Sequence, residues 1–165
     1  FLIEVNPNNV MEENKATVRS YLPADRNAVL ELLQLNTPEF FSPAERKDLE
    51  YYLDHEIESY FVLEINGVVA GSGGINFSED KKTGVISWDM IHPLYHGKGF
   101  GSILLRHRIK LLQTTHLVEK IKVRTSQHTF RFYEKSGFRI LNTVPDYWAK
   151  GFDLVEMEYR GIIHE

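Results

Sequence analysis

The sequence predicts a single α+β domain in which a mixed, mostly antiparallel sheet carries helices on both faces. The expected order of elements is β-α-α-β-β-β-α-β-α-β-β. In the middle of the chain, an Asn66-Gly67 turn joins residues 60–65 to residues 68–77, which is typical of an antiparallel hairpin. A helix is expected after the glycine-rich residues 96–102, and the strands before and after it should lie parallel, because a βαβ crossover requires it.

The first half of the chain is expected to supply one strand, two helices and a meander. Residues 16–22 alternate between apolar and polar types and are expected to form a strand. A helix is expected over 23–35, where apolar residues recur at helical spacing. A second helix over 42–55 should begin with a capping box, because Glu45 follows Ser42 by three residues. The expected meander strands are 60–65, 68–77 and 85–91.

The second half is expected to alternate helices and strands. A helix runs to about Gln113, and a short helix at 129–136 should stop at Gly137, which suits a left-handed cap. The expected strands are 120–125, 138–144 and 154–159. The segment between the last two strands, which includes residues 145–148, is expected to be a loop.

Composition limits the classes of protein to which the chain can belong. Its 165 residues are enough for one domain, with an expected core over about 16–160. The absence of cysteine excludes disulfides, thiolate metal ligands and a cysteine nucleophile. The apolar run Phe1-Leu2-Ile3 is too short for a signal-peptide core, and no run approaches membrane-spanning length. A cytoplasmic protein without membrane partners is therefore expected. No metal site is expected either, because no expected helix carries two histidines at His-x-x-x-His spacing.

Residues 96–102 read His-Gly-Lys-Gly-Phe-Gly-Ser, and a helix is expected directly after them. The glycines leave backbone N–H groups uncovered, and the first N–H groups of a helix have no intrahelical partner, so an anion site is predicted. A Walker A loop is excluded because Lys98 lies between the first two glycines. A dinucleotide fingerprint fails because Ser102 stands at the third glycine position. The alternative is a surface turn that binds nothing.

The net charge of −4 conceals an asymmetry along the chain. Residues 98–139 contain ten Lys or Arg and two Glu, so this segment carries +8 and the remainder carries −12. The basic segment begins at the glycine segment, as a polyanionic cofactor would favour. The acidic remainder would repel a long phosphate backbone, so no nucleic-acid partner is expected.

A second motif follows about thirty residues later, where residues 132–138 read Phe-Tyr-Glu-Lys-Ser-Gly-Phe. Alone, this motif is an amphipathic helix end with a glycine stop. Together with the glycine segment and the element order, it resembles the GNAT superfamily of acyl-CoA-dependent N-acetyltransferases over residues 16–159. The resemblance implies the GNAT fold and acetyl-CoA as a co-substrate.

The resemblance also implies a role for each motif. The N–H groups of the glycine segment would hold the pyrophosphate of acetyl-CoA. The strand end at residues 89–91, where a bulge commonly splays the parallel strands, would pair with its pantetheine arm. Tyr133 would protonate the leaving thiolate. The implied cofactor-binding residues are Met90, Ile91, His96, Gly97, Lys98, Gly99, Phe100, Gly101, Ser102, Ser126 and Tyr133.

Three positions depart from the family pattern. His96 replaces the usual Arg or Gln, although the pyrophosphate contacts there are expected to come largely from the backbone. Ser126 replaces a frequent asparagine, which weakens one expected polar contact to coenzyme A. Val85 stands where some histone-type members carry a catalytic glutamate, so that base is absent.

Another group must therefore accept the proton of the attacking amine. Asp89 is the candidate base, and strand alternation predicts that it shares a face with Val85 and Ser87. Its alternative role is to position the strand. Other candidates are His92, His128 and a water relay to Glu64.

The sequence thus predicts a transferase that passes the acetyl group of acetyl-CoA directly to a primary amine of a small molecule or peptide. The acidic second helix would attract a cationic amine, unless it is only a solvated face. The aromatic residues Tyr147 and Trp148 would stack on the acceptor or cover the core edge. The alternatives are a catalytically silent acyl-CoA-binding domain and a nucleotide-binding protein. A homodimer is compatible with the resemblance.

Overall fold

A computed structural model describes residues 15–164 of the chain. The apolar residues Phe1, Leu2 and Ile3, which were predicted to be too short for a signal-peptide core, lie outside this range. The strands are β1 (Ala16–Ser20), β2 (Ser59–Ile65), β3 (Val68–Phe77), β4 (Thr83–Ile91), β5 (Lys120–Thr125), β6 (Phe138–Ala149) and β7 (Phe152–Tyr159). The helices are α2 (Arg26–Leu35), α3 (Glu45–Tyr51), α4 (Phe100–Gln113) and α5 (Phe130–Lys135), with short helical turns η1 (Pro23–Asp25), η2 (Tyr52–Glu56) and η3 (Pro93–Tyr95). No helix in the described range is long and apolar enough to span a membrane.

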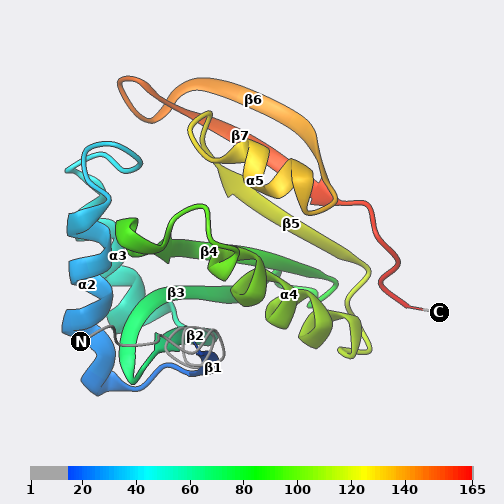
Figure 1. Cartoon of the computed structure of the whole chain (residues 1–165). Coiled ribbons are helices and arrows are strands. Elements are labelled where there is room, and N and C mark those ends of the chain that lie inside the picture. Colours follow the sequence, from blue (N-terminus) through cyan, green and yellow to red (C-terminus); the bar gives the residue numbers. More distant parts are fainter. Residues whose placement is uncertain (1–14, 165) are drawn as a thin grey trace, which may run out of the picture.

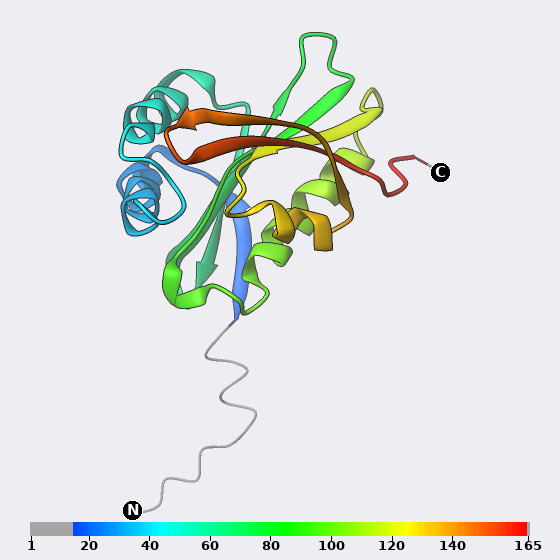
Figure 2. The ribbon, with the colours of Figure 1, turned by 90° about the horizontal axis from the view of Figure 1, so that it is seen from above.

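One seven-stranded sheet organises the fold, with the strand order β1-β2-β3-β4-β5-β7-β6. β4 and β5 are parallel, and the other neighbouring strands are antiparallel. The parallel pair flanks α4, so the predicted crossover and the mixed sheet are confirmed. Figures 1 and 2 show α2 and α3 on one side of the sheet and α4 and α5 on the other.

Each face of the sheet has its own hydrophobic core. α4 and α5 pack on one face, where Leu105 of α4 and Ile121 of β5 are fully buried. α2 and α3 pack on the opposite face, where Val29 and Leu49 are fully buried. The apolar stripes of the helices therefore bury both faces of the sheet, as the residue spacing predicted.

The starts of the helices follow the local sequence. The backbone N–H of Ser42 donates to Glu45 Oε2 at 2.7 Å. This is the predicted capping-box hydrogen bond in which the glutamate side chain accepts from the backbone of Ser42. α4 begins at Phe100 after Gly99, whose φ of 86° is in the left-handed region that favours glycine. The helix therefore begins inside the glycine segment rather than directly after residue 102, and its predicted end at Gln113 is confirmed.

The prediction of a loop over residues 145–148 is wrong. β6 continues to Ala149, which pairs with Phe152, so the hairpin with β7 closes only at its tip. The strand is irregular there, because Asp146 has a positive φ of 51° and the register shifts between Val144 and Ala149. Pro145 and Asp146 are typical of a turn, and they favoured a loop in the prediction. Pairing of β6 with β7 on both sides of these residues instead places them in a bulged strand.

The predicted face of Asp89 is also wrong. Two steps along β3, from Ser72 to Gly74, oppose three steps along β4, from Met90 to Ser87, so β4 carries one extra residue. The bulge includes Trp88, whose φ is 50°. Side chains after it switch faces, because an inserted residue breaks the period of two. Asp89 therefore faces α4, whereas Ser87 faces Tyr52 of η2.

Candidate active site

The parallel strands β4 and β5 separate near the middle of the sheet. Their paired residues run from Thr83 with Lys120 to Ile86 with Val123, and the pairing stops there. A cavity of about 780 Å³ opens beyond this point. It extends from the segment before α4 to the connection between α2 and α3, and from β4 to the tip of the β6–β7 hairpin. Its volume is in the range of small-molecule and cofactor sites.

The glycine segment forms one end of the cavity. Gly97 and Gly99 have φ values of 72° and 86°, and no atom lies within 4 Å of where a Cβ would stand. Within the described range, the N–H groups of Gly97, Lys98 and Gly99 meet no hydrogen-bond acceptor. The first turn of α4 adds further N–H groups without intrahelical partners. Together they present partial positive charge to the cavity, as an anion site requires.

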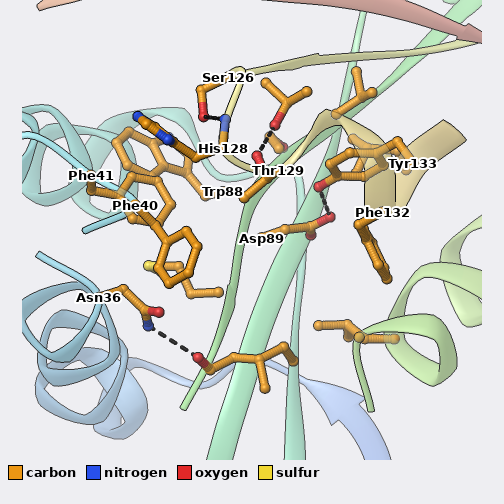
Figure 3. Close-up of a pocket in the computed structure, with 18 of the residues that line it drawn as sticks. Asn36, Phe40, Phe41, Trp88, Asp89, Ser126, His128, Thr129, Phe132 and Tyr133 are labelled. Carbon is orange, nitrogen blue, oxygen red and sulfur yellow. Dashed lines mark hydrogen bonds between the residues drawn. The ribbon is translucent and has the colours of Figure 1, made fainter. Parts of the chain in front are cut away.

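Contacts at the end of β4 fix the neighbourhood of the glycine segment. The carbonyl oxygen of Ile91 accepts hydrogen bonds from Asn36 Nδ2 at 3.0 Å and from His96 Nε2 at 2.7 Å. The ring of Phe40 lies edge-on to that of His96, at 5.3 Å between centroids. The segment after α2 therefore contacts both β4, through Asn36, and the glycine segment, through Phe40. Figure 3 shows the hydrogen bond of Asn36.

A buried polar cluster lies under the separation of the strands. The Tyr133 hydroxyl donates to Asp89 Oδ2, and Asp89 Oδ1 forms an ion pair with Arg108 Nη1. Arg108 is fully buried and also donates to the carbonyl oxygens of Leu104 at 3.2 Å and Gly74 at 3.1 Å. A glycine at position 73 leaves room for this cluster, because a Cβ there would collide with Asp89.

The environment of Tyr133 keeps its hydroxyl protonated. Burial raises its pKa well above the usual value, and the negative charge of Asp89 raises it further. The guanidinium of Arg108 acts in the opposite direction but is outweighed. Tyr133 is therefore a neutral proton donor throughout the physiological range, with its hydrogen bond directed at Asp89.

The structure brings most of the predicted site residues to one cavity. Lys98 is the exception among the predicted cofactor-binding residues, since it does not line the cavity and its Nζ lies 5.8 Å from the ring centroid of Tyr95. The predicted residues that line the cavity are Asp89, Met90, Ile91, His96, Gly97, Gly99, Phe100, Gly101, Ser102, Ser126 and Tyr133.

The alternative bases are placed differently. His128 lines the cavity, as does Val85 at the position of the missing glutamate. His92 does not, and its Nδ1 accepts from the N–H of Leu94 at the start of η3. Glu64 also lies outside the cavity lining, where it accepts from Arg19 at 2.8 Å. No group of three or more possible metal ligands occurs among residues 15–164.

Arg108 and the aromatic residues after α2 line the cavity but were not predicted as site residues. A signal for Arg108 was present, because it stands four residues from both Leu104 and Leu112 in the apolar stripe of α4. A basic residue at such a position needs a buried partner, and Asp89 supplies it. For Phe40 and Phe41 no regular spacing gave a signal, since they lie outside helices and strands.

Comparisons with known proteins show which proteins the chain resembles. The family model described as "Acetyltransferase (GNAT) family" matches residues 28–138. An "Amino-acid acetyltransferase" of Pasteurella multocida (strain Pm70) is 28% identical over 132 residues, which are 78% of this chain and 28% of that protein. The chain thus spans little more than a quarter of this relative's length.

Solved structures share the fold at low sequence identity. The ribosomal-protein-S18-alanine N-acetyltransferase from Escherichia coli is 20% identical, with a TM-score of 0.72 over 88% of this chain and 93% of that chain. An aminoglycoside 6'-N-acetyltransferase complexed with coenzyme A is 13% identical, with a TM-score of 0.70 over 86% of this chain and 95% of that chain.

Proposed function

Because the chain belongs to the GNAT family of acetyltransferases, we propose that it transfers the acetyl group of acetyl-CoA to a primary amine. One observation carries the proposal. Residues with unpaired N–H groups at the start of α4 line the same cavity as Tyr133 and Asp89, and this cavity opens where β4 and β5 separate. Such a cavity offers an anion site and a proton donor on either side of a gap in the sheet.

The residues of the cavity fit acetyl-CoA as a co-substrate. The N–H groups of residues 97–102 would bind its pyrophosphate, since helix N-termini and glycine loops favour anions. Phosphate contacts made by backbone groups do not depend on the side chain of His96, whose ring is already engaged with Ile91. The acyl thioester would then lie in the gap between β4 and β5, next to Tyr133.

In the proposed reaction the neutral amine attacks the thioester carbonyl carbon directly. The C–N bond forms, the C–S bond breaks, and the thiolate leaves with a proton from Tyr133. No acyl-enzyme through cysteine can occur, because the chain has no cysteine. The chain's own contribution is to hold the two substrates in line and to supply and accept protons.

The contact between Asp89 and Tyr133 links the two proton transfers. Asp89 would accept the proton of the amine and return it to Tyr133 as the latter protonates the thiolate. A tyrosinate next to the Asp89 carboxylate would be strongly disfavoured, so the return must accompany the donation. Arg108 would hold the Asp89 carboxylate in place for both steps.

The proposal is tested by measuring thiol release from acetyl-CoA with a panel of amines, beside calorimetric titration with acetyl-CoA. The panel includes free amino acids, because the Pasteurella relative is named an amino-acid acetyltransferase. Amine-dependent release of coenzyme A supports the proposal. Tight binding without turnover for every amine would favour a silent acyl-CoA-binding domain. Displacement of bound acetyl-CoA by ATP, without turnover of any amine, would favour a nucleotide-binding protein.

A further inference from the structure

An aromatic wall borders the cavity on the face of the sheet covered by α2 and α3. The rings of Phe41 and Trp88 are stacked with 6.2 Å between centroids, and Tyr52 lies 6.2 Å from Trp88. All three residues line the cavity. Figure 3 shows Phe40, Phe41 and Trp88 together on the side of Asp89 opposite to Tyr133. This wall offers an apolar surface to a molecule that enters from the α2–α3 side.

The β6–β7 hairpin and the end of β5 form the opposite wall. Trp148 lines the cavity, and its indole N–H donates to the carbonyl oxygen of Thr125 at 3.1 Å. The guanidinium of Arg124 lies 5.5 Å from the Trp148 ring and 5.0 Å from the Tyr147 ring. Arg124 Nη2 also donates to the Tyr147 hydroxyl at 2.6 Å. Figures 1 and 2 both show the tip of this hairpin reaching toward the α2–α3 segment.

Arg124 carries a positive charge that no acid of residues 15–164 neutralises. It also lines the cavity, but no carboxylate in this range lies within ion-pair distance of it. Two neighbouring cases differ. Arg108 is paired with Asp89, and Lys122, two residues before Arg124 on the same face of β5, lies 3.6 Å from Glu156. The charge of Arg124 is therefore available to an anionic group of a ligand.

The position of Arg124 relates this charge to the proposed reaction. Val123 is the last residue of β5 that pairs with β4, so Arg124 stands where the strands separate. The reacting amine must reach the thioester at this gap. A carboxylate on the carbon next to the amine would then lie beside Arg124. Two acids, Glu45 and Glu56, line the cavity from the α3–η2 side and would attract the positive end of a zwitterion.

We propose that the acceptor is a free α-amino acid with an apolar, preferably aromatic, side chain, whose carboxylate binds Arg124 and whose side chain packs against Phe41 and Trp88. This inference rests on the proposed acetyltransferase function. It distinguishes the acceptor from plain amines and from peptide N-termini, since neither carries a carboxylate next to the reacting nitrogen.

The test compares three acceptors that differ only beside the nitrogen: phenylalanine, phenylalaninamide and 2-phenylethylamine. We expect kcat/KM to be about tenfold to hundredfold higher for phenylalanine, the range of a charge-assisted hydrogen bond. The variant Arg124→Gln should lose that advantage, so that its kcat/KM values for phenylalanine, phenylalaninamide and 2-phenylethylamine become similar. The control Lys122→Gln, on the same face of β5, should keep it. Free alanine, whose side chain is too small to pack against Phe41 and Trp88, tests the role of the aromatic wall. Its kcat/KM as an acceptor should be lower than that of phenylalanine.

Equal rates for the three acceptors, or an unchanged preference in Arg124→Gln, would overturn the role of Arg124. Equal rates for alanine and phenylalanine would overturn the role of the aromatic wall. Calorimetric titration of phenylalanine into the protein saturated with coenzyme A separates this inference from the proposed function. If phenylalanine binds to the unmodified protein but not to Arg124→Gln, and no turnover occurs, the acceptor site is supported and the proposed transferase function is contradicted. Absence of both binding and turnover with amino acids would overturn the inference, whatever other amines are acetylated.

Discussion

The hydroxyl of Tyr133 on α5 donates a hydrogen bond to the carboxylate of Asp89 on β4, 44 positions earlier in the chain. This contact exists because the bulge at Trp88 turns Asp89 toward α4 and α5. Arg108 completes the cluster from α4. Three elements thus join a candidate proton donor, a candidate proton acceptor and a buried cation beneath the gap in the sheet.

Replacing Tyr133 by Phe should lower kcat by about 100-fold or more, because general acid catalysis typically contributes a factor of this size. The ring would keep its packing against Phe132 and Phe138, at 5.0 and 5.7 Å between centroids. The Kd of acetyl-CoA should stay the same in calorimetric titration. Tyr159→Phe is the control, since Tyr159 also packs on Phe138 but does not line the cavity. Unchanged kcat in Tyr133→Phe would contradict the assignment.

The ion pair of Asp89 with Arg108 should show strong coupling in a double-mutant cycle. Asp89→Asn and Arg108→Met should each lower the free energy of unfolding by about 3 kcal/mol, because each leaves one buried charge unpaired. The double variant should cost clearly less than the sum of the two. Urea unfolding measures these values.

The exposed pair Arg46 and Glu50, at 3.0 Å, supplies a matched cycle for comparison. Its coupling energy should be about 0.3–0.5 kcal/mol, as for other surface pairs one helical turn apart. If the two cycles gave the same coupling energy, Arg108 would not be the partner on which the Asp89 carboxylate depends.

Gly99→Ala should weaken acetyl-CoA binding about tenfold while the protein still folds. The left-handed φ of 86° costs a residue with a Cβ about 1–2 kcal/mol, so the segment would relax away from the conformation that exposes its N–H groups. No clash contributes, because nothing lies within 4 Å of the added Cβ.

Gly67→Ala is the matched control for the glycine segment. Gly67 has a φ of 80° and equally open surroundings, but it lies in the turn between β2 and β3. This variant should lose stability to a similar extent and keep its affinity for acetyl-CoA in calorimetry. Equal loss of affinity in the two variants would mean that the glycine segment has no specific role.

Stability should fall as pH rises above about 10. Burial raises the pKa of Tyr52 to about 12 and also raises the pKa values of Tyr60 and Tyr133. Unfolded tyrosines lose their protons near pH 10, so above that pH the unfolded state binds fewer protons than the folded state. The stabilising contribution of each protonated tyrosine is complete below pH 10 and is lost as pH approaches its folded pKa.

Tyr52→Phe should therefore reduce the slope of unfolding free energy against pH between 10 and 12, by up to about 1.4 kcal/mol per pH unit. Denaturant unfolding at a series of pH values measures the slope. Tyr51→Phe, which changes the adjacent ring on the exposed side of the same segment, should leave it unchanged. If the unfolding free energy fell equally steeply with pH in Tyr52→Phe and in the unmodified protein, the raised pKa of Tyr52 would not be a source of this pH dependence.

The sequence alone determined the order of elements, the parallel pair around α4 and the glycine segment at its start. These features are local, because backbone preferences and the periods of strands and helices act over a few residues. Gly97 and Gly99 could be identified as loop glycines because only glycine adopts their φ values at little cost. Tyr133 was predicted as a site residue from the resemblance to the GNAT superfamily, and Asp89 from strand alternation relative to Val85.

Tertiary structure alone decided which of these side chains meet. The single extra residue at Trp88 reversed the face of Asp89, and a bulge depends on how β3 and β4 pair rather than on either strand's own pattern. Arg108 had to be buried by the packing of α4 before its pairing with Asp89 became favourable. The sequence by itself thus determined the elements and the place of the glycine segment. Long-range packing decided the contacts among Asp89, Tyr133 and Arg108, because ion pairs and strand registers depend on residues distant along the chain.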